Sequence, residues 1–180
     1  MAEQFDRLGE THISFIKQQK MFFVGSASRD GRVNVSPKGH DCLKILSPAQ
    51  LVWLNLTGSG NETAAHLLDQ NRMTLMWCAF EGPPQILRIY GSARTIHPRD
   101  QEWSDLAQLI APPLGARQYY VVDIDLVQTS CGYAVPLYEY QEDRQALTRW
   151  NEKKGSQGIE EYWQDRNTLS LDGAPTRILE

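Results

Sequence analysis

The sequence predicts a mainly β fold, an antiparallel barrel of about six strands with helices at its periphery. Two observations support this prediction. Strand-like runs dominate the middle of the chain, between residues 21 and 128, whereas the helix-prone segments are few or lie toward the ends. Strands and helices also fail to alternate regularly, which argues against a doubly wound parallel sheet. An antiparallel barrel accommodates such a strand-rich chain.

The predicted elements are separated by clusters of glycine, proline and small polar residues. A helix is predicted where apolar residues recur at helical spacing, as they do after residue 61. Gly91 is expected to break the longest strand. In chain order, the prediction is a helix at 12–19, strands at 21–28, 32–36, 43–46 and 51–56, a helix at 62–71, strands at 73–80 and 85–96, a helix at 98–110, a strand at 118–128 and helices within 141–167.

The dipeptide Asp30-Gly31 lies between the first two predicted strands. An Asp-Gly pair in this position is typical of a tight hairpin, because glycine tolerates the positive φ that the turn requires. Val33 and Val35 alternate with polar residues in the second strand, so its polar side chains share one face. Pro37 and the glycine after Lys38 are expected to disrupt the strand.

The composition changes near Tyr140. Residues 1–140 carry the strands and are expected to form the barrel domain. Residues 141–180 are expected to form a helical tail, divided at Gly155 and Gly158, that packs on the barrel or on a partner subunit. The last residues, 170–180, are expected to be loosely held.

The bulk composition narrows the function classes. The chain has 180 residues, a hydrophobic fraction of 41% and a net charge of −4, so no overall basic field favours nucleic acid or an anionic membrane. No apolar run approaches the roughly 20 residues that span a bilayer, and the polar N-terminus lacks a signal peptide, so we expect a cytoplasmic protein. The three cysteines have neither metal-ligand nor disulfide spacing, so we expect no metal site.

The first candidate for ligand binding is the segment from Arg32 to Lys38. One strand face presents a guanidinium, an amide and the hydroxyl of Ser36, and the strand ends in a proline and an ammonium. This set suits an anionic ligand with several hydrogen-bond acceptors. A solvated strand face followed by a turn would have the same pattern.

The second candidate is the segment from Thr57 to Thr63, between a predicted strand and a predicted helix. A glycine-rich loop that enters a helix leaves free backbone N–H groups at the positive end of the helix dipole, and both favour a phosphate. Ser59 and Asn61 add side-chain donors. Neither the Walker A pattern nor GxGxxG is present, and a simple capped helix start would also fit these residues.

Other chemistry-bearing residues give weaker indications. His66 has no second ligand at metal spacing, and Asp123 with Asp125 fits a solvated strand face better than an acid–base pair. Trp77 and Cys78 lie on the strand that follows the second candidate segment, so they are candidates for its surroundings. No catalytic residue can be assigned from the sequence.

Four blocks of the chain together resemble a known family. From about residue 15 to residue 140, the chain is similar to the pyridoxamine 5'-phosphate oxidase-like, FMN-binding split β-barrel family. The order of strand, Asp-Gly hairpin, strand and a small-polar loop before a helix is typical of that family. The blocks are FFVGSASRDGRVNVSPKG, LVWLNLTGSGNETAAHL, RMTLMWCAFEGPPQILRIYGSA and VQTSCGYAVPLYEY.

The resemblance implies a six-stranded antiparallel split β-barrel that binds flavin mononucleotide (FMN) at the interface of a homodimer. It further implies a flavin-dependent oxidoreductase that acts on a small molecule. The segment from Arg32 to Lys38 would line the isoalloxazine and supply phosphate contacts, and the loop and helix start would contact the phosphate and ribityl chain. The turn from Cys131 to Tyr133 would add to the cleft. The implied FMN-binding residues are Arg32, Val35, Ser36, Pro37, Lys38, Thr57, Ser59, Asn61, Glu62, Thr63, Trp77 and Cys78.

The chain departs from the vitamin B6 oxidases themselves at two places. Those enzymes have a basic Ser-Arg-Lys stretch at the phosphate loop, where this chain has Asn61-Glu62-Thr63. A carboxylate beside a phosphate is unfavourable, so Glu62 is expected to turn away or to pair with Arg32 or Lys38. The C-terminus also lacks their Arg-Leu-Ala-Pro-like ending, so pyridoxamine phosphate is not the expected substrate.

Three rival functions remain open at this point. The same cleft could hold the deazaflavin F420 in a reductase. The protein could instead bind flavin or haem without catalysis, as a carrier or sensor. A third possibility is a barrel whose cleft holds no cofactor, which would show neither a chromophore nor stabilisation by FMN.

Overall fold

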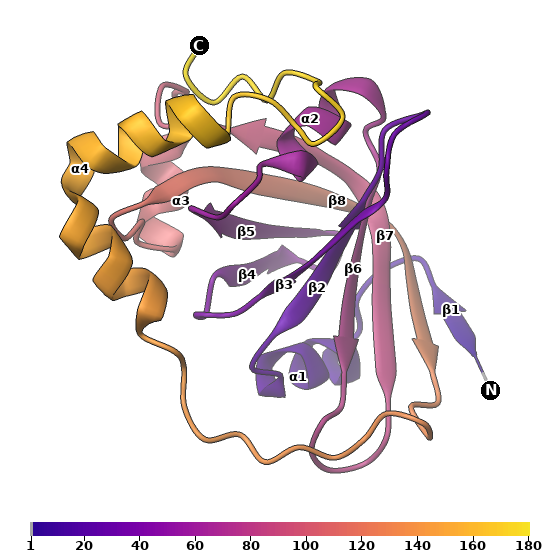
Figure 1. Cartoon of the computed structure of the whole chain (residues 1–180). Coiled ribbons are helices and arrows are strands. Elements are labelled where there is room, and N and C mark those ends of the chain that lie inside the picture. Colours follow the sequence, from indigo (N-terminus) through magenta and orange to yellow (C-terminus); the bar gives the residue numbers. More distant parts are fainter. Residues whose placement is uncertain (1) are drawn as a thin grey trace.

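Eight strands form one curved antiparallel sheet in the computed structural model, which describes residues 2–180 (Figure 1). The strand order is β3-β2-β6-β7-β8-β5-β4, and β1 pairs with the last residues of β8. The strands are β1 (Glu3–Phe5), β2 (Phe22–Ser26), β3 (Asn34–Lys38), β4 (Leu43–Ser47), β5 (Gln50–Leu56), β6 (Met73–Cys78), β7 (Ile86–Ile96) and β8 (Ala116–Ser130).

The longest strand, β8, organises the sheet. It pairs with β7 along most of its length, while β5 and β1 share its other edge. The inner face of the sheet is aromatic: Trp53 stacks on Tyr120 with 4.5 Å between ring centroids, and Phe22 stacks on Trp77 at 5.4 Å. These large apolar side chains are buried, and their burial is the main force that holds the strands in register.

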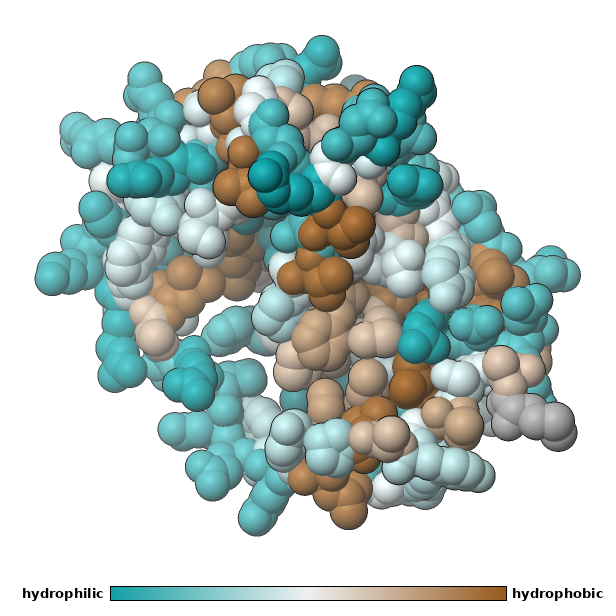
Figure 2. All heavy atoms as spheres, turned by 45° about the vertical axis from the view of Figure 1, so that its right-hand side comes forward, coloured by the Kyte–Doolittle hydropathy of each residue, from teal (hydrophilic) through white to brown (hydrophobic). Residues whose placement is uncertain are grey.

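Four helices surround the sheet: α1 (Glu10–Gln18), α2 (Glu62–Asp69), α3 (Trp103–Leu109) and α4 (Ala146–Arg166). An extended segment, residues 131–145, runs from β8 to α4, which lies to one side of the sheet (Figure 1). The surface is hollowed on the side of this segment (Figure 2). Among residues 2–180, no helix is long and apolar enough to cross a membrane.

The predicted antiparallel architecture with peripheral helices is confirmed, but the sheet has eight strands rather than about six. Strand β1 lies outside all of the predicted strand ranges. Its three residues are too few to show an alternating pattern, and it exists because it pairs with the distant residues 127–129 of β8.

The predicted pairing of β2 with β3 is confirmed, but the prediction of a tight Asp-Gly turn between them is wrong. The last paired residues are Ser26 and Asn34, so seven residues connect the strands, and Gly31 does not adopt a positive φ. The loop is held instead by distant acids, because the Arg29 N–H donates to Asp69 at 2.6 Å. Pro37 lies within β3 rather than ending it, which is possible because β3 is an edge strand.

The predicted break at Gly91 is confirmed as a register shift between β7 and β8. The tail differs from its prediction in two respects. The helix is interrupted at Gly155, where φ is 65°, as predicted, but it continues through Gly158. Residues 170–180 are not loosely held, because Thr176 and Ile178 are buried and Arg99 donates to the main-chain oxygens of Arg177 and Ile178.

Candidate functional site

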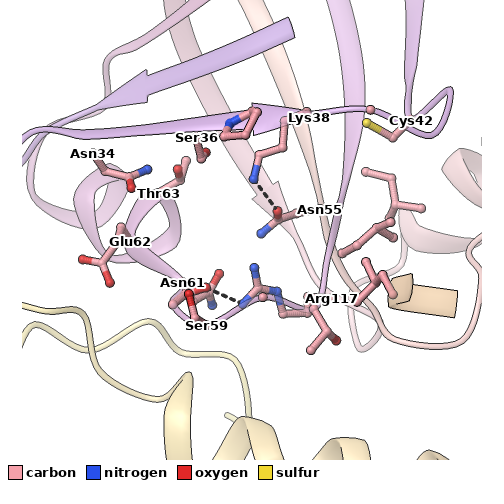
Figure 3. Close-up of a pocket in the computed structure, with 18 of the residues that line it drawn as sticks. Asn34, Ser36, Lys38, Cys42, Asn55, Ser59, Asn61, Glu62, Thr63 and Arg117 are labelled. Carbon is pink, nitrogen blue, oxygen red and sulfur yellow. Dashed lines mark hydrogen bonds between the residues drawn. The ribbon is translucent and has the colours of Figure 1, made fainter. Parts of the chain in front are cut away.

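A cavity of about 500 Å³ lies between the edge strand β3, strand β5 and the start of α2. The loop from Thr57 to Asn61 forms one end of the cavity (Figure 3), and Leu147 and Leu171 of the tail also line it. Its lining therefore joins both candidate segments of the sequence with parts of the chain that lie far from them. We call this space the main cavity.

Strand β3 presents its polar face to the main cavity. Asn34, Ser36 and Lys38 line the cavity together with Pro37, whereas Val35 points to the opposite side and is 63% exposed. This follows from the alternation of a strand, in which successive side chains point to opposite faces. The polar face predicted from the alternation with valine is thus the face of the cavity.

Lys38 brings a partly desolvated cation into the main cavity. Its Nζ donates to Asn55 Oδ1 at 3.2 Å and lies 5.3 Å from the centre of the Trp53 ring. Burial, helped by the nearby positive charge of Arg117, lowers the pKa of Lys38 to about 8. No carboxylate in residues 2–180 forms an ion pair with this ammonium.

Arg117, the second residue of β8, is the other cation of the main cavity and is only 3% exposed. Its Nη1 donates to the main-chain oxygen of Gly60 at 2.7 Å and to Asn167 Oδ1 at 3.0 Å. Burial lowers the pKa of Arg117 to about 10, so the guanidinium is charged at neutral pH. Within the described chain it has no carboxylate partner, which is costly for a buried charge unless a bound anion compensates it.

The loop at the end of the cavity combines fixed residues with free donors. The Thr57 hydroxyl is occupied, because it donates to the Gly115 oxygen at 2.7 Å and accepts from Trp163 Nε1 at 2.9 Å. Ser59 is exposed, and Thr63 in the first turn of α2 accepts from Ser26 Oγ at 3.2 Å. Thr57 and Thr63 therefore shape the loop and the helix start, while Ser59 can reach a ligand.

Three buried polar atoms at the main cavity have no protein partner in the described chain: Ser36 Oγ, Asn61 Nδ2 and Arg117 Nε. All three can donate a hydrogen bond. Asn61 is held in place by its other end, because Gln118 Nε2 donates to Asn61 Oδ1 at 2.6 Å. Buried donors without partners are rare in folded proteins, and their convergence on one cavity fits a ligand with several oxygen acceptors.

Glu62 is directed toward the tail, as expected for a carboxylate that must not face an anion. Both of its carboxylate oxygens accept from the Leu171 N–H, at 3.0 and 3.1 Å. The alternative pairing with Arg32 or Lys38 is not formed. Arg32 forms its ion pair with Asp172 and does not line the main cavity.

Trp77 and Cys78 lie outside the main cavity. Trp77 belongs to the core and lines a neighbouring cavity of about 370 Å³, which also reaches Lys38 and Cys42. Cys78 is buried at the end of β6. Cys131 is exposed and lines a third cavity, beside β1.

Sequence reasoning missed three residues at this site: Arg117, Asn55 and Asn167. Arg117 had the clearest signal, because Arg117-Gln118 is a polar pair at the start of an apolar strand whose predicted beginning was two residues too late. Asn55 interrupts the apolar run of β5 in the same way. Nothing local distinguishes Asn167 from the other polar residues of the tail.

Comparisons with known proteins place the chain in a family. Residues 8–131 match the family model described as "Pyridoxamine 5'-phosphate oxidase". The chain is 33% identical over 189 residues to the pyridoxamine 5'-phosphate oxidase family protein ustO of Aspergillus flavus, covering 95% of this chain and 76% of that protein.

Two solved structures share the fold. A candidate pyridoxamine 5'-phosphate oxidase from Lactobacillus delbrueckii has a TM-score of 0.54 at 19% identity, covering 68% of this chain and 94% of that one. A HupZ variant from Group A Streptococcus has a TM-score of 0.54 at 12% identity, covering 68% and 98%. The open antiparallel sheet is thus the split barrel that the sequence blocks predicted, and the chain belongs to the pyridoxamine 5'-phosphate oxidase family.

Proposed function

We propose that the main cavity binds FMN and that the protein is a flavin-dependent oxidoreductase acting on a small molecule. The observation that carries this proposal is the pair of cations, Lys38 and Arg117, that line one cavity without any carboxylate partner among residues 2–180. A phosphate monoester supplies the missing negative charge. Membership of the family supports a flavin rather than another phosphate ester.

In this proposal the phosphate binds at the end of the main cavity that the loop from Thr57 to Asn61 forms. Arg117, Ser59 and Asn61 would donate to it, together with the free N–H groups at the start of α2. The ribityl chain and the isoalloxazine would follow β3, past Ser36 and toward Lys38. Bound flavin supplies the electron transfer, and the residues of the chain bind it, orient it and set the charge around it.

The other residues predicted from the sequence have lesser proposed roles. Val35 and Pro37 would support the flavin through the main chain of β3. Thr57 and Thr63 would hold the loop, and Glu62 would act only through its bond to the tail. Trp77 would border the neighbouring cavity, where a substrate could approach from the side of Lys38, and Cys78 would support it from the end of β6. Arg32 would fasten the β2–β3 loop to Asp172.

We further propose a homodimer with the flavin at the subunit interface. Val35 lies on the edge strand β3 and is 63% exposed, and Val33, just before this strand, is 73% exposed. Strand β3 also lines the main cavity. Exposed apolar residues at a sheet edge favour association with another chain. Light scattering should give a mass of twice the 20.5 kDa of one chain, and a mass of 20.5 kDa would contradict the dimer.

The absorption spectrum of the freshly purified protein tests the proposed function. We expect flavin bands near ~370 and ~450 nm that bleach on reduction by a nicotinamide cofactor. A Soret band would instead indicate haem, and a spectrum of the deazaflavin type would indicate F420. A colourless protein whose melting temperature does not rise with added FMN would contradict flavin binding, because a ligand of the native state must stabilise it.

The pKa of Lys38 predicts how FMN affinity depends on pH. Since that pKa is about 8 in the free protein, the ammonium loses its charge as the pH rises from 7 to 9. The FMN phosphate is already a dianion above its own pKa of ~6, so over this range the change of charge is at Lys38, and the bound flavin loses the attraction of the ammonium beside it. Affinity measured by fluorescence titration should therefore fall about tenfold between pH 7 and pH 9.

The variant Lys38→Met should abolish this pH dependence, whereas Lys44→Met, which removes an exposed lysine paired with Asp41, should retain it. The stability of the free protein should respond with the opposite sign. Between the lowered pKa of about 8 and the ordinary value of 10.5, the unfolded chain binds more protons at Lys38, so the Lys38 contribution to the free energy of unfolding rises with pH. Equal pH profiles for wild type and Lys38→Met would contradict the assignment.

A further inference from the structure

The tail of the chain contacts the loop at the end of the main cavity at three successive points. Trp163 Nε1 donates to Thr57 Oγ1 at 2.9 Å, and Asn167 Nδ2 donates to the Gly58 oxygen at 3.2 Å. Farther along, the Leu171 N–H donates to the Glu62 carboxylate. The tail therefore follows this loop closely, although it lies outside residues 8–131, which match the family model.

Asn167 occupies the centre of this contact. It is completely buried, and its main-chain oxygen accepts from Thr176 Oγ1 at 2.5 Å. Its side chain uses both ends of the amide, because Oδ1 accepts from Arg117 and Nδ2 donates to Gly58. One side chain of the tail thus connects the cation of the main cavity to the loop that would face the ligand.

The choice of an amide has an electrostatic consequence. An asparagine oxygen orients a guanidinium without neutralising its charge, whereas an aspartate at the same place would form an ion pair with it. The Nη1 of Arg117 donates to two neutral acceptors, the Gly60 and Asn167 oxygens. Neither acceptor neutralises the guanidinium, so its positive charge can attract an anion in the main cavity. Its Nε remains without a protein partner in the described chain.

We propose that Asn167 is a positioning residue of the anion site: it orients Arg117 and the Thr57–Asn61 loop, so that the tail completes the binding of the ligand phosphate. The inference rests on the proposed function for the identity of the ligand. For the presence of an anion site it rests only on the hydrogen bonds of Arg117 and on its partnerless Nε within the described chain.

Two substitutions test the proposal. Asn167→Asp keeps an oxygen beside Arg117 but neutralises it, and Asn167→Ala removes the contact without adding a charge. For both variants we expect FMN to bind at least ~10-fold more weakly, while riboflavin, which lacks the phosphate, binds as to the wild type. Asn151→Asp is the matched control, because Asn151 is a buried asparagine of α4 that donates to the Leu114 oxygen and not to the loop.

A double-mutant cycle separates positioning from general destabilisation. If Asn167 acts through Arg117, then Asn167→Ala should weaken FMN binding little further once Arg117 is replaced by methionine. Additive losses would overturn the proposal, as would equal losses of FMN and riboflavin. Should Asn167→Asp fail to fold, Asn167→Ala alone carries the test.

Inorganic phosphate distinguishes this inference from the proposed function. Wild-type protein should be stabilised by phosphate in a thermal melt, and both Asn167 variants should lose most of that stabilisation. If phosphate stabilises the wild type and FMN does not bind, the flavin proposal fails while the role of Asn167 stands. If phosphate stabilises the wild type and the variants equally, or does not stabilise the wild type, the role of Asn167 is overturned.

Discussion

Replacing Arg117 with methionine should weaken the binding of FMN by at least ~100-fold, because charge-assisted hydrogen bonds to a buried guanidinium contribute about 1.5–3 kcal/mol each. Methionine approximates the length of the side chain without its charge or donors. Riboflavin should bind the variant about as well as it binds the wild type, since it has no phosphate to lose. Fluorescence titration of the apoprotein with both flavins measures this difference.

The expected loss is specific to the site rather than to the fold. The substitution removes an uncompensated buried charge but leaves the Gly60 and Asn167 oxygens without their donor, so we expect the free energy of unfolding to change by less than ~2 kcal/mol. Arg94→Met is the control, because Arg94 lies on the surface in an ion pair with Glu102. An Arg117→Met protein that binds FMN within twofold of the wild type would remove Arg117 from the site.

Replacing Gly91 with alanine should destabilise the protein by roughly 4 kcal/mol or more, a large share of the ~5–15 kcal/mol that stabilises an ordinary domain. A methyl group on Gly91 would overlap the main-chain oxygen of Asp123 on the neighbouring strand β8. Because this atom belongs to a backbone paired on both sides, it cannot move away as a side chain could. Denaturant unfolding, or the yield of soluble protein, measures the effect.

Gly25→Ala is the matched control for this prediction. Gly25 also lies in a strand, but a methyl group there would meet only Thr74, at the ordinary contact distance of 3.8 Å. We expect this variant to fold with a stability close to that of the wild type. If Gly91→Ala were as stable as Gly25→Ala, the register shift between β7 and β8 would not require glycine.

The parts of the fold that were predictable are those whose causes are local. The polar and apolar alternation of β3 and the helical spacing of α2 depend on neighbouring residues, and both were predicted correctly. The predictions failed where residues far apart in the sequence determine the local structure. Strand β1 exists because β8 pairs with it, and the loop after β2 is held by Asp69 and Asp172 rather than by its own Asp-Gly turn.

The same distinction applies to the site. Ser36, Lys38 and Asn61 were identified because they follow recognisable strand and loop patterns, and all three line the main cavity. Arg117 and Asn167 were not, because their positions depend on contacts across 50 residues of chain. Local patterns therefore identify the two walls of the cavity but not the cation at its end.

The most direct test of the flavin proposal is a calorimetric titration of the apoprotein with FMN and with riboflavin under identical conditions. If Arg117 and the donors beside it bind the phosphate, FMN should bind with a Kd of about 1 μM or tighter and riboflavin at least ~100-fold more weakly, which corresponds to ~2.7 kcal/mol. Equal affinities for the two flavins, or no heat from either, would contradict a cavity built around a flavin phosphate.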